Sequence, residues 1–139
     1  MNKSEIKDAL HSYNAVCRER GQISEKIRRL EASLGAAAQG SDGMPHGSGI
    51  SDPTARTAEA LAELKAEYEN MLPNMVKTCL RVERMIESLE PTERTIARYR
   101  YIDGMTWEEV AVATGYSWRQ VHRIHGRLLD HLTEAEKMA

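Results

Sequence analysis

The chain has 139 residues, 41% of them hydrophobic and only 5% aromatic, and its 19 basic and 21 acidic residues give a net charge of −2. This length allows one domain, or a small domain with an extended arm. The balanced charge excludes a polycation that binds nucleic acid through net charge, so any DNA affinity must come from a local basic face.

No apolar run approaches the length of a membrane-spanning helix, and no signal peptide or lipidation motif is present. We therefore expect a cytoplasmic protein with no membrane partner. Cys17 and Cys79 lack metal-binding or redox spacing, which suits small apolar side chains in a reducing cytosol.

Residues Lys3–Leu34 are predicted to form one long helix, because apolar side chains recur at helical spacing among charged ones. The stripe consists of Tyr13, Val16, Ile23, Ile27, Leu30 and Leu34.

The composition then changes sharply. Gly35–Pro53 contains five of the nine glycines and two of the four prolines, which predicts an irregular, flexible insert.

A second long helix is predicted from Thr54 to Leu89, where apolar residues recur by threes and fours. Its stripe is Ala58, Leu61, Lys65, Tyr68, Leu72, Met75, Cys79, Val82, Ile86 and Leu89. Lys65 departs from the apolar pattern, and Pro73 implies a kink or a break. The two helices most simply fold back as an antiparallel hairpin. Each stripe alone buries too little, so the helices pack on each other or on a second subunit.

Two interpretations of this hairpin remain open. It is either an arm that only positions the segment that follows, or a module for dimerisation or for contact with a polymerase. The length of the heptad pattern favours a homodimer.

Three shorter helices are predicted beyond Glu90, and the first runs from Pro91 to about Ile102. Thr106 precedes Glu109 by three residues, and Ser117 precedes Gln120 by three, so each pair is a capping box that starts a helix. Gly115 lies between the two starts and can take a positive φ. A helix, a glycine turn and a second capped helix are typical of a helix-turn-helix, which places its second helix in a major groove.

The second helix of this pair has two distinct faces. One face, Val121, Ile124, Leu128 and Leu132, is predicted to pack on the first helix through Val110 and Ala111. The other face carries Trp118, Arg119, His122, Arg123 and Arg127, and no acidic residue occurs from Trp118 through Leu129. Arginine forks match guanine edges and phosphates, so we interpret this face as DNA-binding. The alternative is a solvated basic face on a small helical domain.

Leu89–Leu132 resembles region 4 of the bacterial sigma-70 factors, which reads the −35 promoter element. The matching segments are Glu93–Tyr101, Gly104, Thr106–Ala111, Gly115 and Ser117–Ile124. The resemblance implies that Trp118, Arg119, His122 and Arg123 face bases and that Thr106 opens a helix whose amides face phosphate. Trp118 and His122 depart from the sigma pattern, so the resemblance supports DNA contact but not recognition of the −35 hexamer. The predicted DNA-binding residues are Thr106, Ser117, Trp118, Arg119, Gln120, His122, Arg123 and Arg127.

The chain is not expected to be a sigma factor, because nothing in it resembles the sigma region that melts and reads the −10 element. The whole chain resembles the small phage regulators of late transcription of the RinA/ArpU type. This resemblance implies a location in the cytoplasm of a bacterial host cell and control of late phage genes, from a prophage or an infected cell, with double-stranded DNA and host RNA polymerase as partners.

Two other functions remain open at this stage. One is a phage terminase small subunit, in which a helix-turn-helix recognises packaging sites. The other is an interaction module that binds polymerase without DNA.

Enzymatic activity is not expected, since no phosphate-binding glycine motif is present. Asp42, His46, Ser48 and Asp52 have the residue types of a catalytic triad, but they occur in a glycine-rich loop and are interpreted as turn and cap residues. No cofactor is expected. His122 and His125 lack an evident third ligand, so no metal is expected either. The predicted fold is all-α, with a hairpin arm at residues 1–90, containing the insert at 35–53, and a helix-turn-helix domain at residues 91–139.

Overall fold

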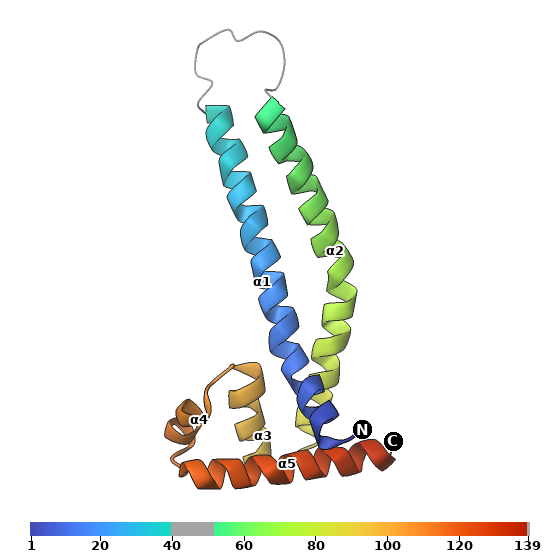
Figure 1. Ribbon diagram of the computed structural model, residues 1–139, viewed down its shortest axis with the longest axis vertical. Coiled ribbons are helices and arrows are strands. Elements are labelled where there is room, and N and C mark those ends of the chain that lie inside the picture. Colours follow the sequence, from blue (N-terminus) through green and yellow to red (C-terminus); the bar gives the residue numbers. More distant parts are fainter. Residues whose placement is uncertain (40–51, 139) are drawn as a thin grey trace. The chain divides into compact units, whose positions relative to one another are not determined.

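A computed structural model describes residues 1–39 and 52–138, and the side-chain surroundings of residues 1–36 and 53–138. Within these ranges the chain is helical and contains no strand, which confirms the predicted all-α fold (Figure 1). The elements in order are α1 (Lys3–Gln39), α2 (Asp52–Glu87), α3 (Pro91–Ala97), the π-helix η1 (Arg98–Ile102), α4 (Trp107–Thr114) and α5 (Trp118–Met138). Over the same ranges, no helix combines the length and the apolar character needed to cross a membrane.

The two long helices extend further than the sequence predicted. α1 continues to Gln39 and α2 begins at Asp52, so the prediction of irregular structure is wrong at residues 35–39 and 52–53. The alanines of Ala36–Ala38 have the highest helix propensity and offset the cost of Gly35. The remainder of the predicted insert, with Asp42, His46 and Ser48, lies outside the described residues. α2 is continuous through Pro73, so the helix does not break at this proline, which was one of the two outcomes predicted from the sequence.

The chain divides into two compact units. We call Met1–Cys17 together with Met75–Ala139 the core unit, and Arg18–Asn74 the arm unit. The division cuts through both long helices. The first turns of α1 and the last turns of α2 therefore belong to the same unit as α3, α4 and α5.

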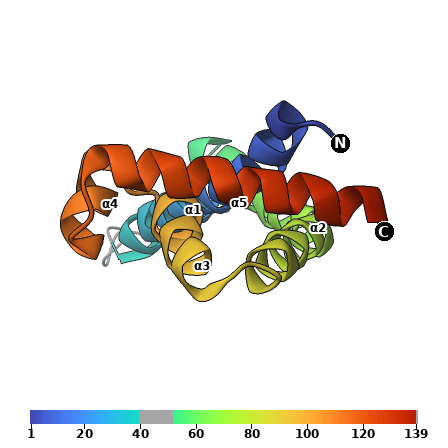
Figure 2. The ribbon, with the colours of Figure 1, turned by 90° about the horizontal axis from the view of Figure 1, so that it is seen from below.

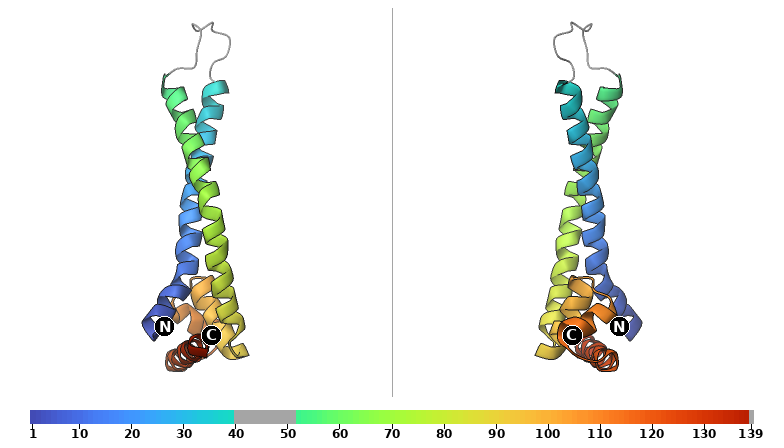
Figure 3. Two further views of the ribbon diagram at one scale, coloured as in Figure 1. Left: turned by 90° about the vertical axis from the view of Figure 1, so that its right-hand side faces the viewer. Right: turned by 90° about the vertical axis from the view of Figure 1, so that its left-hand side faces the viewer.

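In the arm unit, the segments of α1 and α2 run side by side (Figures 1 and 3). Lys65 of α2 forms an ion pair with Glu31 of α1, with Nζ and Oε1 3.1 Å apart. This contact explains how a lysine occupies a position of the apolar stripe. None of the side chains described in this unit is fully buried, and stripe residues such as Ile27 and Leu72 are half-buried. Two helices alone cover their apolar seam only in part.

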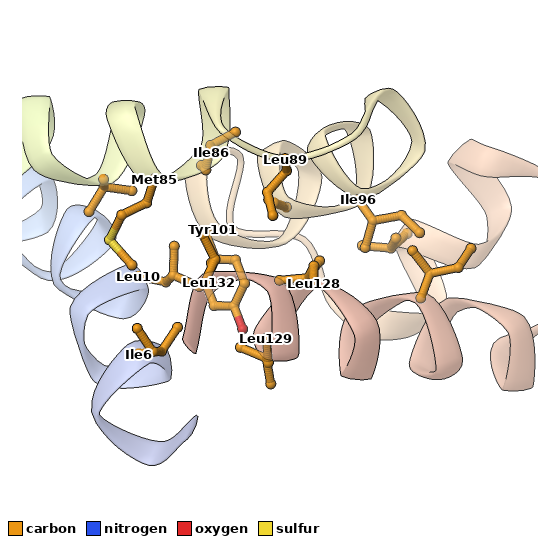
Figure 4. Close-up of a cluster of buried hydrophobic side chains, with 14 of the residues drawn as sticks. Ile6, Leu10, Met85, Ile86, Leu89, Ile96, Tyr101, Leu128, Leu129 and Leu132 are labelled. Carbon is orange, nitrogen blue, oxygen red and sulfur yellow. The ribbon is translucent and has the colours of Figure 1, made fainter. Parts of the chain in front are cut away.

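The core unit contains the only fully buried side chains among the described residues. Figure 2 shows α5 lying across α3 and the ends of α1 and α2 that belong to this unit. The buried apolar residues are Ile6, Leu10, Val82, Met85, Ile86, Leu89, Ile96, Ala97, Tyr101, Val110, Val121, Ile124, Leu128, Leu129 and Leu132. Figure 4 shows Ile6 and Leu10 of α1 facing the same cluster as Tyr101 and Leu128. One core therefore joins residues on both sides of the boundary predicted between residues 90 and 91.

Candidate nucleic-acid interface

The start of α4 is held by its predicted capping box. The Thr106 Oγ1 accepts a hydrogen bond from the Glu109 amide at 3.2 Å, and the Glu109 Oε1 accepts one from the Thr106 amide at 3.4 Å. These two bonds satisfy amides that a helix start would otherwise leave without partners. Thr106 is therefore engaged in fixing the helix, and its side chain is exposed at the edge of α4.

The turn between α4 and α5 has the conformation that the sequence predicted. Gly115 takes φ +75°, in the left-handed region, and its amide donates to the Ala111 carbonyl at 3.0 Å. The next helix starts with a second capping box, in which the Ser117 Oγ accepts from the Gln120 amide at 3.1 Å and the Gln120 Oε1 accepts from the Ser117 amide at 2.9 Å. The predicted role of Gly115 and both predicted capping boxes are confirmed.

Three arginines share the solvent face of α5. Arg119, Arg123 and Arg127 are exposed, and none forms an ion pair or hydrogen bond with another described residue. On the opposite face, Val121 and Leu128 are fully buried with Val110 of α4. Packing of one face thus orients the other, and the arginine forks are free to bind an anion or a base edge.

His122 is less accessible than its position on the sequence suggested. Its ring lies between two indoles, 4.7 Å from the ring centroid of Trp107 and 3.9 Å from that of Trp118. The His122 Nε2 is buried and has no hydrogen-bond partner among the described residues. Trp118 remains 57% exposed, so the indole rather than the imidazole presents the larger surface at the start of α5. The stack makes His122 a support for Trp118.

An open groove separates the N-terminal end of α3 from α5. Arg123, Arg127 and Gln120 line one side, and Glu90, Thr92 and Glu93 line the other. Glu93 is buried, and its Oε1 lies 2.7 Å from the Nδ1 of His131. This hydrogen bond, with the charge of Glu93, raises the pKa of His131 and so favours the protonated imidazole beside the carboxylate. The pairing reduces the repulsion that Glu93 would exert on an anion near Arg127.

A hydrogen bond also joins η1 to α5 inside the core. The Tyr101 Oη and the His125 Nε2 are 2.6 Å apart. Burial raises the pKa of Tyr101 to about 12 and, with smaller effects from neighbouring cations, lowers the pKa of His125 to about 4. Both groups are therefore neutral near pH 7, and their hydrogen bond satisfies two polar atoms in an apolar environment.

Arg100 and Trp107 are also neighbours of this face, and neither was predicted from the sequence. The guanidinium carbon of Arg100 lies 4.5 Å from the Trp107 ring centroid, in cation–π geometry, and Arg100 Nη1 donates to the Met105 carbonyl at 2.9 Å. In the sequence, Arg100 stands between two tyrosines, and this pattern does not indicate which residues its side chain contacts. Their contact depends on the π-helical turn of η1, which places Arg100 beside the start of α4. In this turn the Asp103 amide donates a hydrogen bond to the Arg98 carbonyl at 2.9 Å.

No group of three or more His, Cys, Asp or Glu side chains suited to a metal ion occurs in the part of the chain that the structure describes. A scan against models of known protein families, a search of curated proteins and a search of solved structures each found no match.

Proposed function

We propose that this protein is a sequence-specific DNA-binding transcription regulator, with α5 as the helix that enters the major groove. The observation that carries this proposal is the exposed, unpaired row of Arg119, Arg123 and Arg127 on a helix whose start is capped and whose opposite face is buried. Arginine is the commonest side chain in specific contacts with guanine and also binds phosphates.

The sigma region 4 resemblance of Leu89–Leu132 supports the same assignment, because it aligns Arg119 and Arg123 with base-facing positions. On the same basis we propose that the genes under control are late genes of a phage, and that host RNA polymerase is a second partner. The protein acts as a binding component of the transcription machinery and performs no chemistry of its own.

A single unit of this size makes few phosphate contacts, and the chain as a whole carries no excess of positive charge to add to them. We propose that a homodimer, held through the arm unit, is the DNA-binding species, since two linked copies bind as one bivalent unit. The half-buried seam of the arm, where Ile27 and Leu72 remain partly exposed, is the surface that a second copy would cover.

The proposal is tested by footprinting purified protein on restriction fragments from the genome that carries its gene. We expect protection of a discrete site in a region that flanks the gene. The salt concentration should be about 0.1–0.2 M, at which specific binding remains tighter than non-specific binding to the rest of the DNA. Arg84→Ala, which removes an exposed arginine on α2 that has no ion pair with the described residues, should leave the footprint intact. Absence of any protected site over the whole genome would contradict sequence-specific binding.

A further inference from the structure

We infer that the DNA interface extends beyond α4 and α5 onto a second basic surface, the basic flank, which consists of Lys7, His11, Arg100 and His122 and binds a phosphodiester group of the DNA backbone. This inference rests on the proposed function and adds a contact that the helix-turn-helix alone does not contain. The flank draws on three elements, since Lys7 and His11 come from α1, Arg100 from η1 and His122 from α5.

A continuous set of ring contacts connects three of these side chains, His11, Arg100 and His122, and Lys7 lies one turn before His11 on α1. His11 meets the edge of Tyr101 with centroids 5.0 Å apart, and Tyr101 is hydrogen-bonded to His125. The His125 ring then lies 4.5 Å from that of Trp107. Trp107 in turn contacts both Arg100, at 4.5 Å, and His122, at 4.7 Å. The first helix is thereby connected to the start of α4 and to the recognition face of α5.

The positions of the α1 residues are fixed by packing on both sides of the flank. Ile6 and Leu10, which bracket Lys7 in sequence, are completely buried in the core. Lys3 also forms an ion pair with Asp130 of α5, with Nζ and Oδ1 2.8 Å apart. Lys7 and His11 are exposed on the same helix, one turn apart. An exposed side chain on a backbone held this firmly can bind a ligand without ordering the helix first.

The flank carries positive charge that few carboxylates offset. Burial lowers the pKa of His11 most, and Arg100 and Lys7 lower it further, while Asp8 acts in the opposite direction. Burial also dominates the lowered pKa of His125, to which Lys7, His122, Arg100 and His11 all contribute. The four residues of the flank therefore lie within electrostatic reach of one imidazole, and Asp8 is the one acidic residue that acts on either ring. An anion bound beside Lys7 and Arg100 would offset the charge of these two side chains.

Two nitrogen atoms of the flank lack partners inside the described chain. The Nε of Arg100 and the Nε2 of His122 are both buried without a hydrogen bond, so a phosphate on the surface would be bound by the terminal Nη atoms of Arg100 and not by these two nitrogens. Arg100 is held against Trp107 and by the Met105 carbonyl, and a guanidinium fixed in this way presents its remaining donors in a rigid fork. Phosphate oxygens accept hydrogen bonds from such a fork.

The place of the flank beside the proposed interface identifies the anion as the DNA backbone. Trp107 is the first residue of α4, and His122 lies one turn after Trp118 and Arg119 on α5. A duplex that lies against the arginine row therefore carries its backbone past the start of α4 and towards Arg100. A phosphate group in this position would contact Arg100 and Lys7 from two different elements, and would fix the register of α5 without reading sequence.

The experiment uses the full chain and a 30-bp duplex of arbitrary sequence at about 50 mM salt, where phosphate contacts dominate binding. Lys7→Ala should weaken the affinity about five- to tenfold and reduce the slope of log K against log salt by about 0.9, the value for one lost phosphate contact. His11→Gln should produce a smaller loss. Lys77→Ala, which removes an exposed lysine from α2 in the same unit, is the matched control and should leave both quantities unchanged.

The outcomes separate this inference from the proposed function. Lys7 is exposed and forms no ion pair with the described residues, so circular dichroism should show an unchanged helical fold in its variant. If Arg119→Ala weakens binding while Lys7→Ala behaves like Lys77→Ala, the basic flank is not part of the interface and the proposed function stands. If the wild-type protein does not bind the duplex at all, the basic flank does not bind the DNA backbone; if it also protects no genomic site, the proposed function is overturned as well.

Discussion

The Nδ1 of His131 lies 2.7 Å from the Oε1 of Glu93, so that a half-exposed imidazole on α5 is the partner of a buried carboxylate on α3. A buried carboxylate is costly unless it is paired and hydrogen-bonded. The hydrogen bond that His131 donates to Glu93 raises the pKa of His131 most, and the charge of the carboxylate raises it further. The pair therefore couples the position of α5, and of the arginines on it, to the protonation of one histidine.

This coupling predicts a pH dependence of folding. Because the folded pKa of His131 is raised, its stabilising contribution is complete below the unfolded value of about 6.5 and is lost as the pH rises through the folded pKa. The contribution should stay below about 1 kcal/mol, since half of the ring is exposed to solvent. Urea unfolding of the wild type and of His131→Gln between pH 6 and pH 9 measures it. Parallel pH profiles for the two proteins would contradict the prediction.

His125 predicts the opposite pH dependence. Its folded pKa is lowered from 6.5 to about 4, chiefly by burial, so its contribution is present above pH 6.5 and is lost as the pH falls through 6.5 towards 4. This shift corresponds to roughly 3 kcal/mol. Between pH 7 and pH 4, the free energy of unfolding of the wild type should fall by about this much more than that of His125→Gln. The control variant His131→Gln retains His125 and should show the same fall as the wild type. A loss of the same size in His125→Gln would show that another group titrates.

Two glycines of the core unit should respond to alanine in opposite ways. Gly115 adopts φ +75° at the end of α4, and a Cβ in that region costs about 1–2 kcal/mol. Gly126 lies inside α5, where an added Cβ would meet no atom within 4 Å apart from its chain neighbours and the nearby backbone of its own helix. Gly126→Ala should therefore stabilise the fold by about 0.5–1 kcal/mol. In thermal unfolding, Gly115→Ala should lower the unfolding temperature and Gly126→Ala should raise it. A neutral or stabilising Gly115→Ala would contradict the left-handed conformation of this turn.

The arm unit should hold the proposed dimer together. Charged substitutions at Leu61 and Leu72, which are half-buried in the seam, should shift the protein from dimer to monomer in sedimentation velocity and weaken DNA binding at sub-micromolar concentration. Val82 is unsuitable for this test, because it is completely buried in the core unit. Ser24→Asp, on the exposed side of α1, is the control for an added charge. A wild-type protein that sediments as a monomer, alone and on DNA, would defeat the prediction.

Local signals account for the part of the fold that the sequence predicted. The capping boxes at Thr106 and Ser117 depend on residues three apart, and the left-handed conformation of Gly115 depends on one residue. The helical stripes likewise repeat within a few residues. Such patterns are visible in the sequence because the interacting groups are neighbours along the chain. The helix at Gly35–Gln39 was not predicted, because the glycines of this region favoured a loop. The high helix propensity of the three alanines after Gly35 proved more important.

Contacts between distant residues were not predictable in this way. Glu93 and His131 are 38 residues apart, and Tyr101 and His125 are 24 apart, so no periodicity connects them. The stripe of the first helix was predicted from Tyr13 onward, but the residues of α1 that are fully buried are Ile6 and Leu10. Their burial depends on where α5 passes, which helical spacing alone does not determine.

The most direct test of the central claim is a titration of Arg119→Ala and Arg123→Ala against the footprinted site, with Arg84→Ala as control. Each arginine of α5 that contacts a base bidentately should cost about 1–3 kcal/mol of binding free energy when removed, and should relax the preference at one base pair. The control should bind like the wild type. Wild-type affinity in both α5 variants, with their helical content unchanged by circular dichroism, would show that this face does not bind DNA.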